Sequence, residues 1–196
     1  MPKTFSDKEK ESIRNTLKAV AADNLKKFGV KKTTVDELVK HANIPKGTFY
    51  LFYNSKEELF FDVINDLHNT IHKELLNNAT GISSDYSADK LTDLLFEIYK
   101  SIEKTGLIEL IINGDMDIIM RKLPDQIVRE HFNKDDFSLE NLLSNLPVRQ
   151  NTNIQAYSAA FRAVFLSVKY RREIGEELFD DAIKLLIRGL VVQLND

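Results

Sequence analysis

The chain has 196 residues, of which 43% are hydrophobic and 29% are charged, a balance that suits a globular protein of one or two domains. It contains no cysteine, which excludes disulfides and thiolate metal sites. No apolar run approaches the roughly 18 residues of a membrane-spanning helix, and the charged start from Lys3 onward is unlike a secretory signal. We therefore expect a cytoplasmic protein.

Charge is distributed unevenly along the chain. Residues 1–60 hold 12 Lys and Arg against 8 Asp and Glu, whereas the remaining residues hold 15 against 22. A basic N-terminal region on an acidic remainder indicates a polyanion partner at that end.

Apolar residues recur at helical spacing along almost the whole chain, which predicts an all-α protein. Ser6 and Glu9 form a capping box at the start of a first helix, and Gly29 supplies its stop. Thr34 and Glu37 repeat the capping box for a second helix that ends near residue 42.

The next segment predicts a tight turn and two more helix starts. Asn43 suits a left-handed turn, and Pro45 suits the first turn of a third helix of about two turns that ends near Tyr53. Ser55 and Glu58 cap a fourth, longer helix. Two short helices joined by a tight turn, between two long helices, are the outline of a helix-turn-helix.

The rest of the chain predicts a helical body. We expect helices over residues 88–104, 107–113, 115–122, 124–132, 153–171 and 176–194, with a short helix between turns in 133–147. The pattern divides the chain into a region with the helix-turn-helix at residues 1–54 and a helical body at 55–196.

The third helix is the one that can enter the major groove of double-stranded DNA. We expect its exposed positions to be Pro45, Lys46, Thr48, Phe49 and Tyr50. Gly47 costs about 1 kcal/mol relative to alanine in a helix interior, which a close approach of the backbone to DNA would explain. Thr34 and Lys56 lie at the starts of neighbouring helices, whose amides suit phosphate binding.

The stretch "TTVDELVKHANIPKGTFYLFYNSKEELF" closely resembles the DNA-binding region of the TetR family of bacterial transcriptional regulators. This resemblance implies an all-helical homodimer with a three-helix DNA-binding head at residues 1–54 and a ligand-binding and dimerisation body at 55–196. The same resemblance implies that the protein binds a palindromic operator, acts as a repressor released by a small molecule, and is not an enzyme. It also implies phosphate contacts from Thr34, Tyr50 and Lys56, and base or backbone contacts from Lys46 and Thr48. The chain departs from the family in having Asn43 where glycine is usual.

Aromatic and methionine side chains of the body are candidates for an effector pocket. An apolar or aromatic small molecule would suit them, with tyrosine hydroxyls as polar handles. The candidate pocket residues are Phe96, Tyr99, Met116, Met120, Tyr157 and Phe161. The last two helices are unusually apolar, and we expect two copies to pair there through Phe165, Leu186, Ile187 and Leu190.

Two other classes of function compete with a regulator. His68 and His72 are four residues apart on one helix, a spacing that can chelate a metal in an enzyme, although no third ligand is evident. We therefore expect neither a metal nor another cofactor. The other alternative is a helix-turn-helix adaptor that binds protein instead of DNA.

Overall fold

The computed structural model describes residues 5–79, 87–144 and 151–194, and every regular element within these ranges is a helix. None of the described helices is both long enough and apolar enough to span a lipid bilayer. The elements are α1 (Asp7–Lys32), α2 (Val35–His41), α3 (Lys46–Phe49), α4 (Lys56–Ala79), α5 (Ala88–Thr105), α6 (Leu107–Ile112), α7 (Asp115–Lys122), α8 (Asp125–Ser144), α9 (Ile154–Leu166), the 3-10 helix η1 (Ser167–Tyr170), α10 (Arg171–Ile174) and α11 (Phe179–Gln193).

Packing divides the chain into two compact units. The first contains residues 1–67 and 113–123, and the second contains residues 68–112 and 124–196. Helix α4 contributes residues to both units, and α7 belongs to the first unit although it follows α5 and α6 in the sequence. The proposed functional boundary between residues 54 and 55 divides the chain by role and remains a prediction.

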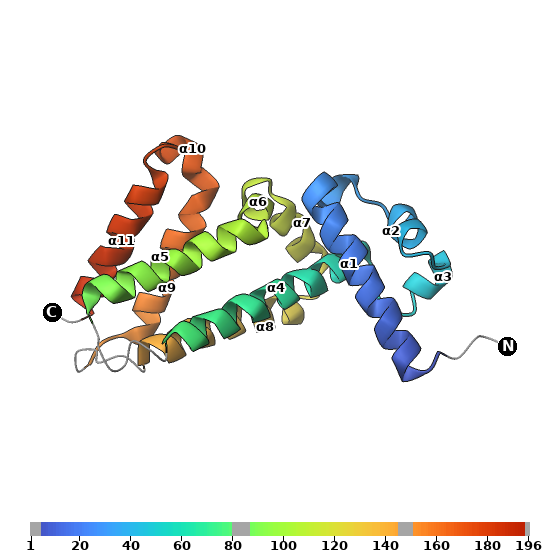
Figure 1. Cartoon of the computed structure of the whole chain (residues 1–196), viewed down its shortest axis with the longest axis horizontal. Coiled ribbons are helices and arrows are strands. Elements are labelled where there is room, and N and C mark those ends of the chain that lie inside the picture. The colour runs from blue at the N-terminus through green and yellow to red at the C-terminus, as the bar shows by residue number, and fades with distance from the viewer. Residues whose placement is uncertain (1–4, 80–86, 145–150, 195–196) are drawn as a thin grey trace. The chain divides into compact units, whose positions relative to one another are not determined.

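In the first unit, α1 packs against α2 and α7, and α2 leads through a tight turn into α3 (Figure 1). Its core is formed by apolar side chains from α1 to α4 and from α7 that are at most 8% exposed: Leu17, Ala21, Leu25, Val30, Leu38, Val39, Ala42, Phe49, Tyr53, Leu59, Phe60, Phe61, Val63, Ile64 and Ile119. This core holds the two short helices in place, although neither is long enough to be stable alone.

Gly29 interrupts α1 close to its C-terminal end. Its φ of 70° is the positive angle expected of a helix stop, but its ψ of -178° is extended, a combination that is almost exclusive to glycine. A Cβ atom at this position would lie 2.6 Å from Oδ2 of Asp115, the first residue of α7. The missing side chain of Gly29 therefore lets α7 approach α1.

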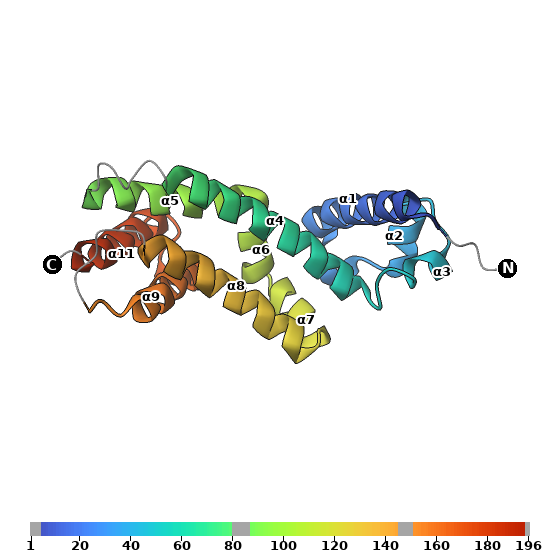
Figure 2. The same ribbon diagram turned by 90° about the horizontal axis from the view of Figure 1, so that it is seen from below.

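In the second unit, α5 packs along α11, and α9 packs against both α8 and α11 (Figure 2). The core between them includes Leu91, Leu95, Tyr99, Phe161, Phe179, Ile183, Ile187 and Val191. This unit is therefore a helical bundle built mainly from segments far apart in the sequence.

Helix boundaries in the second unit differ in places from the sequence expectation. Helix α8 is continuous over Asp125–Ser144, where we expected one helix to end at residue 132 and a short one to follow. The polar residues between them include neither glycine nor proline, so nothing in the backbone chemistry ends the helix there. The expected helix over 153–171 instead passes from α9 through η1 into α10, which ends at Gly175 with φ 121°.

Candidate DNA-binding site

Local hydrogen bonds build the helix-turn-helix largely as the sequence predicts. The Thr34 hydroxyl accepts from the Glu37 amide at 3.2 Å, while the Glu37 carboxylate accepts from the Thr34 amide at 2.8 Å, which completes the capping box. Asn43 has φ 53°, the left-handed conformation expected of the turn. The Ile44 amide then donates to the Val39 carbonyl at 3.0 Å and closes the end of α2.

Helix α3 is shorter than expected, but its helical turns continue beyond it. Pro45 precedes its first residue, and the amides of Leu51 and Phe52 donate to the carbonyl oxygens three residues earlier. Gly47 is exposed, and a Cβ atom there would meet no described atom within 4 Å. The space above Gly47 is therefore open to a large partner.

Most predicted contact residues of this surface reach solvent. Pro45, Lys46 and Gly47 are exposed, Thr48 is half-buried, and Tyr50 is 51% exposed. Phe49 is the exception, because it is fully buried and its ring packs against those of Tyr50 and Tyr53. The expectation that Phe49 is exposed and contacts DNA is therefore wrong, because its side chain lies on the side of the short helix that faces the core.

The Lys56 ammonium does not extend into solvent but folds back onto the end of α1. It donates to the carbonyl oxygens of Val30 at 2.7 Å and Thr33 at 2.6 Å, at the end of α1. These bonds supply donors to carbonyls that a helix end leaves without partners. Lys56 therefore stabilises the end of α1. Its predicted phosphate contact remains a prediction, as does the phosphate contact predicted for Thr34, which is exposed.

A partly exposed polar cluster joins Tyr53, which follows α3, to α1 and α4. The Tyr53 hydroxyl donates to Asp62 at 2.8 Å, and Lys18 pairs with Asp62 at 3.0 Å and Asp66 at 2.8 Å. Burial, and then the hydrogen bond to Asp62, raise the pKa of Tyr53 well above its usual value. Sequence reasoning missed the partners of Lys18, which are more than forty residues away and give no local signal.

The candidate effector residues are divided between the two units. Phe96, Tyr99, Tyr157 and Phe161 belong to the core of the second unit, where the rings of Phe96 and Tyr99 lie 5.9 Å apart. Met116 and Met120 lie on α7 in the first unit. The packing therefore brings four of the six together in one core and groups the two methionines with the head.

Two hydroxyls in the second unit are buried without a hydrogen-bond partner among the described residues. They are the Tyr99 hydroxyl and Oγ of Ser158, in side chains that are 4% and 1% exposed. Burial, and then the nearby charge of Glu103, raise the pKa of Tyr99 to about 12, so the group is a neutral phenol at pH 7. Tyr99 was predicted as a polar handle, whereas Ser158 was not, because serine in an apolar helix is too common to stand out.

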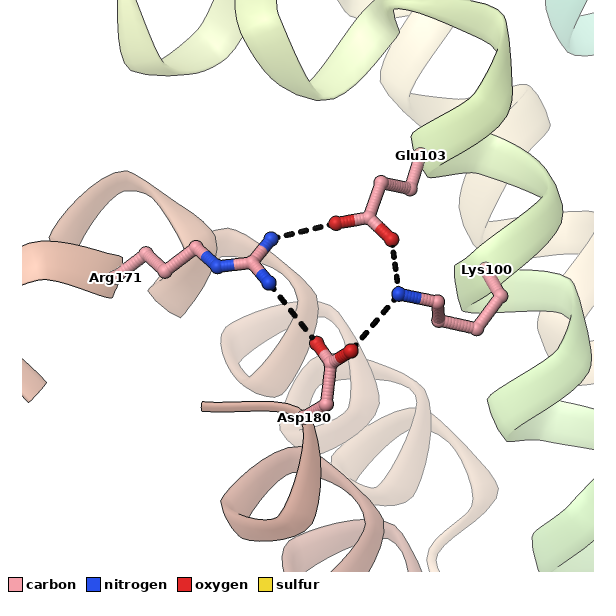
Figure 3. A network of polar contacts seen from close by, with 4 residues as sticks. All are labelled: Lys100, Glu103, Arg171 and Asp180. Carbon is pink, nitrogen blue, oxygen red and sulfur yellow. Dashed lines mark hydrogen bonds and ion pairs between the residues drawn. The ribbon is translucent and has the colours of Figure 1, made fainter. Parts of the chain in front are cut away.

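Four charged side chains beside Tyr99 form a closed ring of alternating sign (Figure 3). Lys100 pairs with Glu103 and, at 2.8 Å, with Asp180, while Arg171 pairs with the same two carboxylates. The ring connects α5 to α10 and to the start of α11. It is a structural feature that sequence spacing could not reveal, because its members come from three separate segments.

The predicted dimer residues have unequal surroundings. Leu186 is 52% exposed, and its neighbour Leu185 is 70% exposed. Phe165 and Leu190 are partly buried against the core of the second unit, and Ile187 lies inside that core with 5% exposure. Ile187 is therefore a core residue of its own chain, and Leu185 and Leu186 form the exposed apolar face of α11.

The histidines do not form a described metal site. The rings of His68 and His131 stack with centroids 4.7 Å apart, and His131 is buried. The side chain of His72 lies outside the described residues. Among the side chains that the structure describes, no group of three His, Cys, Asp or Glu could hold a metal ion.

The fold and the site together define a class, a helix-turn-helix protein with an all-helical body. Residues 18–63 match the family model described as bacterial regulatory proteins, tetR family. The chain is also 41% identical over 59 residues to the uncharacterized HTH-type transcriptional regulator YhgD of Bacillus subtilis (strain 168), a match that covers 30% of this chain and 29% of YhgD. The match thus spans less than a third of that relative's length.

Solved structures match over almost the whole chain. A TetR-family transcriptional regulator from Streptomyces coelicolor is 14% identical with a TM-score of 0.65, over 95% of this chain and 97% of that one. Thermus thermophilus FadR, a TetR-family transcriptional repressor in complex with lauroyl-CoA, is 16% identical with a TM-score of 0.62, over 93% and 95%. Residues 18–63 therefore match the TetR family of bacterial regulatory proteins in sequence, and the chain as a whole has the fold of TetR-family regulators.

Proposed function

We propose that the chain is a ligand-responsive transcriptional regulator that binds a palindromic operator as a homodimer, acts as a repressor in the cytoplasm and is released from the operator by a small molecule. The observation that carries the proposal is the open surface over Gly47, flanked by exposed Lys46 and Tyr50 on a packed helix-turn-helix. The proposal assigns the chain no catalytic activity, cofactor or metal.

The surface chemistry supports DNA as the partner. The major groove is wide enough to admit an α-helix, and the helix backbone can approach the DNA closely where a residue has no side chain. Gly47 meets this condition, while Lys46 offers an ammonium and Tyr50 a hydroxyl to phosphates or base edges. The half-buried Thr48 supplies a further hydroxyl donor at a neighbouring position.

An exposed apolar surface supports pairing of two copies. Leu185 and Leu186 on α11, together with Leu166 at the end of α9, are between 48% and 70% exposed. A monomer gains nothing from such exposure, whereas a twofold partner would cover it. Two heads must also lie about 34–36 Å apart to bind the half-sites of a palindrome in successive major grooves.

The interior of the second unit supports a small-molecule effector. Its core is apolar and aromatic, and the hydroxyls of Tyr99 and Ser158, which have no partner in the described part of the chain, are potential hydrogen-bonding groups for a ligand. FadR, which shares this fold, was solved in complex with lauroyl-CoA. An effector that prefers the state unable to bind the operator by a hundredfold would shift the equilibrium by about 2.7 kcal/mol.

The proposal is tested by capturing fragments of the genome that encodes the chain with purified protein. Wild type should enrich fragments that contain an inverted repeat. Gly47→Leu should remain folded by circular dichroism but lose this binding, because leucine would stand between helix and groove. Gly47→Ala is the matched control, since its methyl group occupies open space and should weaken binding far less.

Either of two outcomes would overturn the proposal. Normal capture of the same fragments by Gly47→Leu would remove the assignment of this surface to DNA. Failure of wild type to enrich any fragment would favour the alternative of a helix-turn-helix adaptor that binds protein.

A further inference from the structure

The recognition surface carries a carboxylate beside its principal cation. Lys46 Nζ lies 2.9 Å from Oδ1 and 3.0 Å from Oδ2 of Asp36, and the side chains are 51% and 72% exposed. Asp36 belongs to the first turn of α2, and Lys46 is the first residue of α3. The ion pair thus places an acceptor and a donor side by side at the start of the helix proposed to enter the groove.

A carboxylate at this position is difficult to explain by attraction to the DNA backbone. Phosphates attract Lys46 in any sequence, but they repel Asp36. The group in the major groove that suits a carboxylate is an exocyclic amino group, and Asp or Glu typically accepts from N4 of cytosine. The partner of that cytosine, guanine, presents two acceptors, O6 and N7, which suit an ammonium.

The geometry of the ion pair matches one base pair better than the others. In a G·C pair, guanine O6 and cytosine N4 are hydrogen-bonded to each other, so an acceptor and a donor lie about as far apart as Lys46 and Asp36 do. An A·T pair also places an amino group beside a carbonyl, but its acceptors lie on both sides of the amino group. It also presents the thymine methyl group, a poor neighbour for two charges.

We propose that Lys46 and Asp36 act as one unit that selects a G·C base pair in each operator half-site, with Asp36 as a specificity-determining residue. This inference rests on the proposed DNA-binding function. In the complex, Lys46 donates to guanine O6 or N7 while Asp36 accepts from cytosine N4. The two side chains need little rearrangement, because they already lie together in the structure without DNA.

The test is selection of binding sites from a pool of randomised DNA duplexes by full-length wild type, Asp36→Ala and a control variant. Asp23→Ala is the matched control, because Asp23 is also 72% exposed and paired with a lysine on the head, Lys27 at 3.4 Å. Wild type and Asp23→Ala should prefer G·C at one position of each half-site. Asp36→Ala should lose at least roughly fivefold of that preference, the lower end of the discrimination a specific base contact gives.

Asp36 lies in the first turn of α2, where an acidic residue stabilises the helix, so Asp36→Ala could fail to fold. A second variant keeps the test decisive in that case. Asp36→Asn retains an acceptor oxygen and adds a donor, the pair of groups that asparagine presents to adenine. It should shift the preference at the same position from G·C toward A·T.

The outcomes separate the inference from the proposed function. If the variants bind every sequence more tightly with unchanged base preferences, Asp36 only screens Lys46 and the inference is overturned, while DNA binding stands. If wild type enriches no sequence, the proposed function itself fails and the inference fails with it.

Discussion

The ammonium of Lys56, at the start of α4, donates a hydrogen bond of 2.6 Å to the carbonyl oxygen of Thr33, directly after the end of α1. Thr33 is itself fully buried, so this contact joins two long helices of the head at a point that water reaches poorly. A residue that the sequence suggests for DNA binding is therefore also part of the framework.

Lys56→Ala should lower the free energy of unfolding by about 1–3 kcal/mol, because two helix-end carbonyls lose their charged donor. Urea denaturation followed by circular dichroism measures this, with exposed Lys31→Ala as the control. A phosphate contact from Lys56 would also reduce the salt slope of DNA binding by about one unit. Unchanged stability in Lys56→Ala would contradict the structural role.

Gly29→Ala should destabilise the protein by about 1–3 kcal/mol, since a φ of 70° with ψ of -178° is strained for any residue with a side chain. The new methyl carbon would also meet Asp115 Oδ2 at 2.6 Å. The double variant Gly29→Ala, Asp115→Ala should regain the steric part of the loss but not the backbone part. A thermodynamic cycle with the single variants separates the two, and simple additivity would argue against the contact.

Tyr99→Phe should stabilise the protein by about 1 kcal/mol or more, because it removes a buried hydroxyl that has no described hydrogen-bond partner. Tyr170→Phe is the control, since Tyr170 is 57% exposed and should change little. Thermal unfolding of the three proteins measures the difference. A clear loss of stability in Tyr99→Phe would mean that the hydroxyl is satisfied in solution.

Glu103 should make stability depend on acidic pH. Burial acts to raise its pKa, but hydrogen bonds from Lys100 and Arg171 outweigh burial and hold the pKa below the usual 4.5. A carboxyl whose pKa is lower in the folded state stabilises the fold above the unfolded pKa and loses this contribution as pH falls through the folded pKa. The contribution should stay below about 1 kcal/mol, because the group is partly exposed.

The urea concentration at the unfolding midpoint should be lower at a pH below the usual carboxyl pKa than at neutral pH. Glu103→Gln should make this difference smaller than it is in wild type. Glu97→Gln, at an exposed position of the same helix, is the control and should leave the difference intact. Identical acid sensitivity in Glu103→Gln and wild type would count against the charged ring as its source.

Leu185→Glu should yield folded monomers that bind an operator weakly, because Leu185 is 70% exposed on the face proposed to pair two copies. Ile187→Glu should instead unfold the second unit, since Ile187 is 5% exposed within its own core. Sedimentation at micromolar concentration, combined with circular dichroism, distinguishes the two. Wild type that stays monomeric would exclude the proposed pairing.

Features that depend on neighbouring residues could be predicted from the sequence alone. The capping boxes at Ser6 and Thr34, the left-handed turn at Asn43 and the positive φ at Gly29 all follow from the chemistry of a few adjacent residues. Together with helical periodicity, they predict the all-α fold and the helix-turn-helix.

The tertiary structure alone decided which partner each side chain meets. Helical periodicity identifies an apolar face but not the residues that pack against it. Phe49 and Ile187, predicted to contact DNA and a second copy, are instead buried in the cores of their own units. Lys46 and Asp36 are ten residues apart, and Lys56 and Thr33 twenty-three, distances at which sequence patterns carry no contact information. These contacts exist because burial of the whole core fixes where the short helices lie, and the polar groups at their ends then pair with whatever the fold brings within reach.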